Sequence, residues 1–240
     1  MPNSTERTLS DDVLRCAYTR ITDELRHLLM RCIESAKKAR TFGSVFAEPV
    51  DYIALQIPDY LEVIKRPMDL STLKNNLLLG EYSFLYEFLL DMELIFSNCR
   101  TYNGQNNDGY YYKAAEEIEK FLVNQLARID GLEFDFEIYK AITTVPIPVI
   151  PDYLSMPLSV AELQVLLRRL AELPEAALTE CVHFYLTEKG ENPADFKGTE
   201  LTLKFVSSDS AILRRLDKMV RRKTLEVKEG RSLRTKKAKP

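Results

Sequence analysis

The sequence predicts a mainly α-helical protein with two separate helical domains. Apolar side chains recur every three or four residues in several stretches of the chain, which is the period of an amphipathic helix. Two stretches that contain several prolines, residues 41–68 and 145–151, interrupt this pattern. Proline removes a backbone donor and disfavours helix in the residue before it. An apolar fraction of 45% over 240 residues is ample for two packed cores.

The N-terminal half is predicted to be a bundle of four helices with one long loop. Its first helix is expected to start at the N-cap signal of residues 10–12 and to continue as one apolar stripe to Ala36. Residues 41–68 then form the long loop, and long loops in compact domains are usually functional. Because this loop carries many apolar residues, we expect it to fold back onto the helices.

The other helices of the bundle are expected to meet near Asn103. Asp69 is expected to cap a short helix that ends at Gly80. Two longer helices are expected at about residues 83–102 and 108–128. The uncharged amide of Asn103 then falls between them, with aromatic residues on both sides. Such a position suits the recognition of a neutral polar group in an apolar slot. The alternative role for Asn103 is to cap the last helix.

The C-terminal half is predicted to begin with a linker and to continue as a smaller helical domain. Apolar and acidic residues alternate over residues 132–138, which is a strand pattern, and residues 145–151 are expected to be extended. Helical periodicity returns from Pro157 in two helices, the second of which ends at Gly190. A short strand is expected at residues 200–206, followed by a third, capped helix.

Cysteine and histidine residues are scattered, so we expect no metal site and no cofactor. The cysteines form no CxxC pair and neither histidine lies near a cysteine cluster, whereas zinc requires grouped ligands. Free thiols are typical of a reducing compartment. No apolar stretch approaches the length of a membrane span, and residues 1–12 lack the apolar segment of a signal peptide. The expected location is therefore intracellular.

Residues 221–240 are strongly basic, although the whole chain has a formal net charge of −3. They contain nine lysine and arginine residues against two glutamates. A basic tail on an acidic body is typical of a nuclear import signal or of nonspecific contact with DNA phosphates. The alternative is a solvated helix end that fades into disorder.

Three motifs resemble those of a bromodomain of the BET family. The motifs are Phe46–Asp51, Ile57–Leu70, and Phe96–Cys99 with Tyr102–Asn103. They are long, ordered and correctly spaced, and the resemblance covers roughly half of the chain. It implies a left-handed four-helix bundle that binds acetylated lysine on histone tails.

The resemblance also implies roles for residues around an acetyl-lysine pocket. Asn103 would donate to the acetyl oxygen, and Tyr60 would hold a water that bridges to the same oxygen. An unmodified ammonium facing the Asn103 donors in a dry slot would be costly, so selectivity would need no acidic or basic residue. Tyr102 would lie beside the pocket. The implied walls are Phe46 under the acetyl methyl, Val50, Leu55 and Ile57 on the loop side, and Tyr111 as the gatekeeper.

Two departures from the family pattern affect this pocket. The Trp-Pro-Phe shelf of the family is replaced by Ser44-Val45-Phe46, and the chain contains no tryptophan. Ligands that stack on that tryptophan are expected to bind poorly. The turn after Asn103 is also about two residues longer than in the family, which leaves Tyr110 as a rival to Tyr111 for the gatekeeper position.

A second resemblance is to the extra-terminal domain that follows bromodomains in the BET family. The matching features are Pro157–Ser159, Leu173–Pro174, Leu178, Val182–His183, and a strand at 200–205 followed by a capped helix. Such domains bind short extended peptides of chromatin regulators by adding a strand. The implied peptide-binding positions are Glu200, Thr202 and Lys204. Only Glu200 keeps the acidic charge of the family, which weakens the expected preference for basic peptides.

Together the two resemblances give a domain layout. It comprises a leader at 1–10, a bromodomain at 11–129, a linker at 130–155, an extra-terminal-like domain with one short strand or hairpin at 156–223, and a basic tail at 224–240. The acidic strand pattern of 133–137 also raises the hypothesis that this segment pairs, within the chain, with the strand that contains Lys204. Opposite charges across a strand pair are modestly stabilising.

The function that follows is a nuclear, non-enzymatic chromatin reader. Its bromodomain would bind acetylated lysine, and its second domain would recruit peptides of transcription regulators. The first alternative is a scaffold whose bromodomain no longer reads acetyl-lysine. The second is an enzyme such as a lysine acetyltransferase. No GxGxxG, GxSxG or P-loop motif occurs, however, and the two domains occupy nearly the whole chain. A single bromodomain also leaves dimerisation open.

Overall fold

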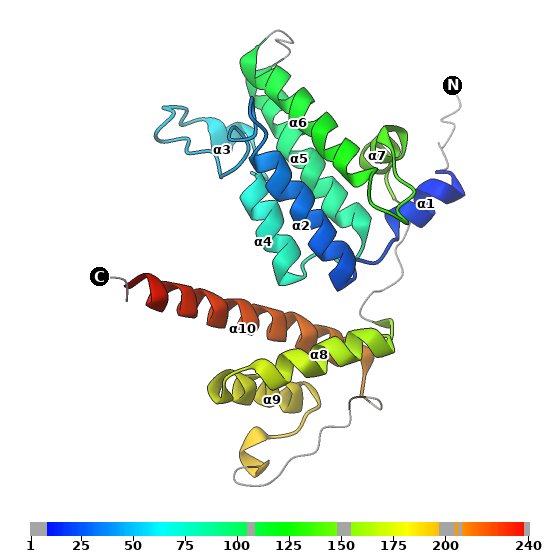
Figure 1. The fold of residues 1–240 in the computed structure, drawn as a ribbon, viewed down its shortest axis with the longest axis vertical. Helices are drawn as coiled ribbons and strands as arrows, with labels where there is room; N and C mark the ends of the chain where they lie inside the picture. The colour runs from blue at the N-terminus through cyan, green and yellow to red at the C-terminus, as the bar shows by residue number, and fades with distance from the viewer. Residues whose placement is uncertain (1–8, 105–108, 148–154, 197–204, 206–207, 238–240) are drawn as a thin grey trace. The chain divides into compact units, whose positions relative to one another are not determined.

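The structure, a computed structural model, describes residues 9–104, 109–147, 155–196, 205 and 208–237. The chain divides into two compact units, Met1–Val149 (unit 1) and Ile150–Pro240 (unit 2), each with its own helices (Figure 1). Within the described residues the regular structure is helical, and a single isolated β-bridge joins Arg20 to Phe84. The predicted mainly α fold class is therefore confirmed.

The bundle of unit 1 consists of four helices that run side by side (Figure 1). They are α2 (Asp23–Lys37), α4 (Leu70–Leu79), α5 (Leu85–Asn103) and α6 (Tyr110–Leu126). Helix α2 packs against α4 and α6, and α5 packs against the same two helices. Large apolar side chains fill the space between them and are almost completely buried. Those from the middle of the bundle include Leu29, Ile33, Leu73, Leu77, Phe88, Leu89, Met92 and Phe96.

The predicted first helix is in fact two helices, so the expectation of one helix running to Ala36 is wrong. Helix α1 (Asp11–Ala17) ends before α2 begins, and Thr22 caps α2 by accepting from the Leu25 amide at 3.3 Å. Between them the backbone pairs with the start of α5, where the Leu85 amide donates to the Thr19 carbonyl at 2.8 Å. An apolar stripe is equally compatible with one helix or two, and this long-range pairing selects two.

The predicted caps of α4 are confirmed. The Asp69 carboxylate accepts from the amides of Ser71 and Thr72 at 2.8 and 3.0 Å, which satisfies the first free donors of the helix. Gly80 ends the helix with φ of 75°, a left-handed conformation that glycine adopts without steric cost. Helices α5 and α6 begin and end within about two residues of the predicted bounds.

The long loop folds back onto α4, as its apolar content predicts. The amides of Leu70 and Ser71 donate to the carbonyls of Phe46 and Ala47 at 2.9 and 3.1 Å. A short helix, α3 (Tyr60–Val63), interrupts the loop, and Ile64 behind it is buried. The loop is therefore a fixed wall at one end of the bundle rather than a free connection.

The strand predicted at residues 132–138 is wrong, because a helix, α7 (Phe136–Thr144), begins inside it. Asp135 caps this helix by accepting from the Ile138 amide at 2.8 Å. Helix α7 packs against α1, α5 and α6 (Figure 1). The hypothesis of strand pairing by 133–137 fails with the strand, because Phe136 and Glu137 are helical. Its proposed partner Lys204 lies outside the described residues.

The segment that contains α7 is part of unit 1, although the sequence pattern assigned it to a linker at 130–155. Its apolar side chains are buried in the unit: Leu132, Phe134, Tyr139 and Ile142. The boundary between the compact units falls between Val149 and Ile150, which is twenty residues beyond the end predicted for the first domain. Of the alternating apolar residues that suggested a strand, Leu132 and Phe134 are instead buried where this segment packs against the helices of unit 1.

The described residues of unit 2 form α-helices and a short 3-10 helix. They are α8 (Val160–Glu172), α9 (Glu175–Glu188), η2 (Pro193–Phe196) and α10 (Ser210–Lys237). Ser159 and Glu162 form a capping box at the start of α8, as the Ser-x-x-Glu spacing favours. The core of the unit is a cluster of buried side chains that includes Leu166, Leu170, Cys181, Tyr185, Phe205, Leu213, Leu216 and Val220. Helix α10 continues well beyond residue 223, where the second domain was predicted to end.

Candidate functional site

A cavity of about 500 Å³ lies at the end of the bundle where α5 ends and α6 begins. The long loop forms one side of it. Every pocket residue predicted from the sequence lines this one cavity: Phe46, Val50, Leu55, Ile57, Tyr60, Tyr102, Asn103 and Tyr111. These residues come from three separate segments of the chain. The sequence motifs gave only their order along the chain, and the fold brings them together around one cavity.

Asn103 is the last residue of α5 and faces the cavity. Its amide nitrogen donates to the Cys99 carbonyl at 2.8 Å and lies 3.6 Å from the Cys99 sulfur. Helix α6 is capped by Gly109, so the alternative role of Asn103 as the cap of the last helix is wrong. The amide carries two hydrogens, and the Cys99 carbonyl fixes the direction of one of them.

Tyr60 and Tyr102 form an aromatic pair beside Asn103. Their ring centroids are 5.1 Å apart in an edge-on arrangement, and the Tyr102 hydroxyl donates to the Asp59 carboxylate at 2.9 Å. Tyr60 begins α3 and is buried. Burial raises the pKa of Tyr60, and the nearby Cys99 and Asp69 add to the rise. Its hydroxyl therefore remains a neutral donor and acceptor at physiological pH.

The inner walls of the cavity are apolar and tightly packed. Phe46 meets Phe96 of α5 edge-on with ring centroids 5.7 Å apart, which holds the Phe46 ring in place. On the loop side, a turn closed by the Ile57 amide and the Tyr52 carbonyl at 2.9 Å presents Leu55 and Ile57 to the cavity. Leu55 is nevertheless half exposed at the rim.

Tyr111, and not Tyr110, lies on the wall formed by α6. Tyr110 points elsewhere and packs edge-on against Phe42, with ring centroids 5.2 Å apart. The Cys99 thiol donates to the Tyr111 carbonyl at 3.3 Å, which joins the last turn of α5 to the first turn of α6. The turn between α5 and α6 is longer than in the family, so sequence spacing left the choice between Tyr110 and Tyr111 open.

Sequence reasoning missed part of the cavity lining. Met68, Ile95 and Cys99 also line it, whereas Ser44 and Val45 line it as the altered shelf already indicated. Ile95 and Cys99 lie eight and four residues before Asn103 on α5, so helical spacing alone places all three on one face. Met68 carried no comparable signal, because only the fold of the loop brings it to the cavity.

Three carboxylates also line the cavity, those of Glu48, Asp51 and Asp69. Glu48 accepts from the Lys37 ammonium at 2.9 Å, Asp51 accepts from the Ala54 amide at 2.9 Å, and Asp69 caps α4. Each carboxylate therefore already has a partner of its own. No lysine, arginine or histidine is among the residues that line the cavity.

The described part of the chain offers neither a cluster of metal-binding side chains nor a membrane-spanning helix. No group of three or more metal-binding side chains gathers there. None of its helices is both long and apolar enough to cross a membrane. The peptide-binding positions predicted for the second domain, Glu200, Thr202 and Lys204, lie outside the described residues.

Comparison with known proteins identifies the domain that holds the cavity. Residues 29–117 match the family model of the bromodomain. The chain is 42% identical over 105 residues to Transcription factor GTE9 of Arabidopsis thaliana, a match that covers 43% of this chain and 15% of that protein. It is 41% identical over 108 residues to Bromodomain-containing factor 2 of Saccharomyces cerevisiae, covering 42% of this chain and 17% of that protein.

A further similarity is to a protein named as an enzyme, Histone acetyltransferase GCN5 of Yarrowia lipolytica. The two chains are 46% identical over 74 residues, which is 31% of this chain and 16% of the relative. In each of these comparisons the matched part is thus less than a fifth of the relative's length. The family match contains every residue of the Asn103 cavity. The cavity therefore lies within the part of the chain that is similar to bromodomains.

Proposed function

We propose that this protein is a chromatin reader whose bromodomain binds acetylated lysine, on histone tails. The observation that carries the proposal is the position of Asn103. Its amide lies at the end of a largely apolar cavity, close to the neutral hydroxyl of Tyr60, and no cation lines the cavity. This set of groups complements an acyl amide on an aliphatic stem, which is the chemical form that acetylation gives to lysine.

Recognition would use a small number of polar contacts inside an apolar slot. The Asn103 amide would donate to the acetyl oxygen and give up its weak contact with the Cys99 sulfur. Tyr60 would hold a water that bridges to the same oxygen. Phe46, Ile57 and Tyr111 would contact the methyl and the stem. An unmodified lysine would place a buried ammonium against an amide donor, which is costly without a free partner charge.

The decisive experiment compares acetylated and unmodified histone-tail peptides on the whole protein. We expect Asn103→Ala to weaken binding of acetylated peptides by about tenfold or more, because a buried acetyl oxygen would lose its donor. Calorimetric titration would measure this change. Asn124→Ala is the matched control, since Asn124 is an exposed asparagine on the neighbouring helix α6. The Asn124→Ala protein should bind acetylated peptides with unchanged affinity.

The result that would reject acetyl-lysine reading is equally specific. Equal binding of acetylated and unmodified peptides by a folded protein would do so, as would an Asn103→Ala variant that binds like its parent. The protein would then act as a chromatin scaffold through unit 2. The replaced shelf at Ser44 and Val45 is the feature that favours this second function, because it removes an aromatic contact surface from the outer groove.

A single site of this kind is expected to bind weakly, with a dissociation constant of roughly micromolar or higher and about 4–8 kcal/mol of binding energy. Useful occupancy would need a second contact on the same chain. We infer that unit 2 and the basic residues 221–240 provide it, by recruiting peptides of transcription regulators and by nonspecific contact with DNA. The relatives named as transcription factors support this inference and a nuclear location.

The role of unit 2 can be tested separately from acetyl-lysine reading. Short extended peptides that carry lysine should perturb the amide resonances of residues 197–207, which include the predicted strand positions. Perturbations confined to unit 1 would reject peptide recruitment by unit 2. We infer no catalytic activity, because the likeness to the acetyltransferase is limited to 74 residues. Turnover of acetyl-coenzyme A would contradict that inference.

A further inference from the structure

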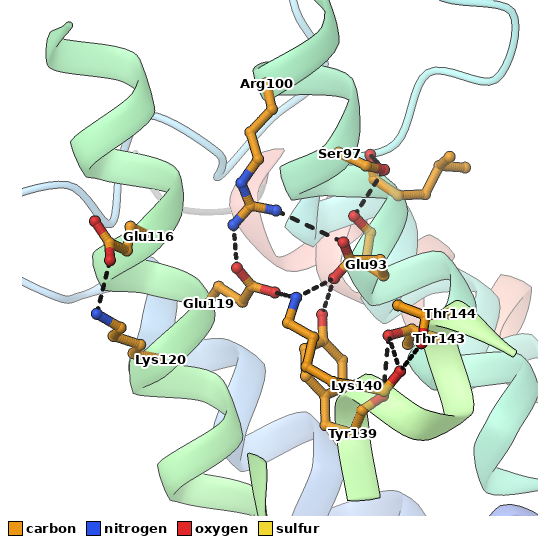
Figure 2. A network of polar contacts seen from close by, with 11 residues as sticks. Glu93, Ser97, Arg100, Glu116, Glu119, Lys120, Tyr139, Lys140, Thr143 and Thr144 are labelled. Carbon is orange, nitrogen blue, oxygen red and sulfur yellow. Dashed lines mark hydrogen bonds and ion pairs between the residues drawn. The ribbon is translucent and has the colours of Figure 1, made fainter. Parts of the chain in front are cut away.

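A network of charged and polar side chains ties α7 to the bromodomain bundle (Figure 2). We call it the α5–α7 network; it comprises Glu93 and Arg100 of α5, Glu119 of α6, and Tyr139 and Lys140 of α7. The Lys140 ammonium lies 2.6 Å from the Glu119 carboxylate and 3.5 Å from that of Glu93. Arg100 pairs with Glu119, and its guanidinium lies 3.6 Å from Glu93.

The network balances one buried and one partly buried carboxylate with two cations. The Glu119 side chain is only 4% exposed. Burial alone would raise the pKa of Glu119, but hydrogen bonding to Lys140 and the charge of Arg100 outweigh it and lower the pKa. Burial raises the pKa of Glu93, and the nearby Glu119 charge adds to the rise. Without Lys140, both carboxylates would share the single guanidinium of Arg100, so α7 completes the charge balance between α5 and α6.

The same part of α5 carries the proposed acetyl-lysine site on an adjacent face. With about 100° of rotation per residue, Glu93 and Arg100 point in nearly the same direction, and Cys99 and Asn103 point roughly a quarter turn away from them. Arg100 directly follows Cys99, whose carbonyl accepts from Asn103 at 2.8 Å and whose thiol donates to the Tyr111 carbonyl at 3.3 Å. The last turn of α5 thus contacts the network through Arg100 and the cavity through Cys99 and Asn103 on the adjacent face.

We propose that the α5–α7 network sets the position of Asn103, so that Lys140 and Glu119 are positioning residues for acetyl-lysine binding. This inference rests on the function proposed above. The Asn103 donor must meet the acetyl oxygen at hydrogen-bond distance, and such bonds weaken steeply when their geometry is lost. A small shift of the α5 end relative to α6 would move Asn103 away from the wall that Tyr111 forms. Helix α7, which lies beyond the family match of residues 29–117, is then part of the reading module.

The test compares Lys140→Met with a matched control, Lys74→Met. Both lysines have about one third of their side chain exposed, and Lys74 pairs with Glu34 at 2.7 Å between α2 and α4. We expect Lys140→Met to weaken binding of an acetylated histone-tail peptide by about three- to tenfold, the range typical of substitutions that alter coupling through a packed network. Lys140→Arg, which keeps the charge, should restore most of the affinity, and Lys74→Met should leave it unchanged.

A second measurement separates positioning from general destabilisation. The side-chain amide resonance of Asn103, assigned by its loss in Asn103→Ala, should shift in Lys140→Met and stay in place in Lys74→Met. Affinities are measured well below each melting temperature, so that every variant is folded. If Lys140→Met does not fold, Glu119→Gln with Lys140→Met replaces it, because the pair restores a neutral balance while still removing the link between α6 and α7.

The outcomes divide as follows. Unchanged affinity together with an unmoved Asn103 resonance would overturn the positioning role, even if the melting temperature fell, and would leave acetyl-lysine reading intact. Failure of the unsubstituted protein to bind acetylated peptides would instead reject the proposed function, and the positioning role with it. Weaker binding with a shifted resonance, rescued by Lys140→Arg, would support the proposal.

Discussion

Ending unit 1 at residue 129 is expected to destabilise the bundle by several kcal/mol, which would leave it largely unfolded under mild conditions. The truncation removes α7 and the buried side chains of Leu132, Phe134, Tyr139 and Ile142. It also leaves the carboxylates of Glu93 and Glu119 with Arg100 as their remaining cation in the network. Loss of a buried aromatic side chain such as Tyr139 alone costs about 3–5 kcal/mol.

Urea denaturation of residues 1–149, 1–144 and 1–129 would measure this effect. The first two fragments both keep α7, so their midpoints should agree, whereas the midpoint for 1–129 should fall far below them. Tyr139→Ala in the fragment 1–149 provides an independent point substitution that removes the same contact. Equal midpoints for all three fragments would show that α7 is an accessory helix. Working with unit 1 alone avoids the overlapping transitions that a two-unit chain would give.

Replacing Arg214 with methionine is expected to destabilise unit 2 by about 3–5 kcal/mol, the range typical of breaking a buried ion pair by removal of one partner. The Arg214 side chain is 4% exposed and lies 2.7 Å from the Glu162 carboxylate. Its guanidinium also donates to the carbonyls of Met156 and Pro157 at 3.3 and 3.0 Å. The substitution therefore leaves a partly buried carboxylate and two carbonyls without these donors.

The same pair makes unit 2 sensitive to acid. Burial alone would raise the pKa of Glu162, but the hydrogen bond from Arg214 outweighs it and lowers the pKa. For a carboxyl group with a depressed pKa in the folded state, the stabilisation is present above the unfolded pKa of about 4.3 and is lost as the pH falls through the folded pKa. We expect the unfolding free energy of unit 2 to decrease as the pH is lowered below about 4. In Arg214→Met the unfolding free energy should depend less steeply on pH over the same range.

Arg215→Met is the matched control for both measurements. Arg215 is the next residue on α10 and pairs with Glu188, but its side chain is 44% exposed. Exposed ion pairs contribute about 0–1 kcal/mol, so this variant should remain close to the parent protein. Thermal unfolding of residues 150–240 between pH 3 and pH 7 would compare the three proteins. Similar losses in Arg214→Met and Arg215→Met would contradict the expected role of burial.

Much of the cavity lining could be predicted from sequence because the motifs that supply it are local and consecutive. Tyr60, in the motif Pro58-Asp59-Tyr60, and the helix end at Tyr102–Asn103 were both placed by the bromodomain resemblance, and Tyr60, Tyr102 and Asn103 line the cavity. The choice between Tyr110 and Tyr111 could not be made in this way. It depended on the rotation of α6 about its axis, which is set by the packing of Tyr110 against Phe42.

By itself the sequence determined where most helices begin and end and which residues form the end of the bundle. Caps such as Asp69 and Gly80 act within a few residues, so they are visible without a fold. Tertiary structure alone decided that α1 and α2 are separate and that residues 136–144 form a helix of unit 1. In both places the hydrophobic pattern fitted more than one structure, and only contacts with distant residues select between them.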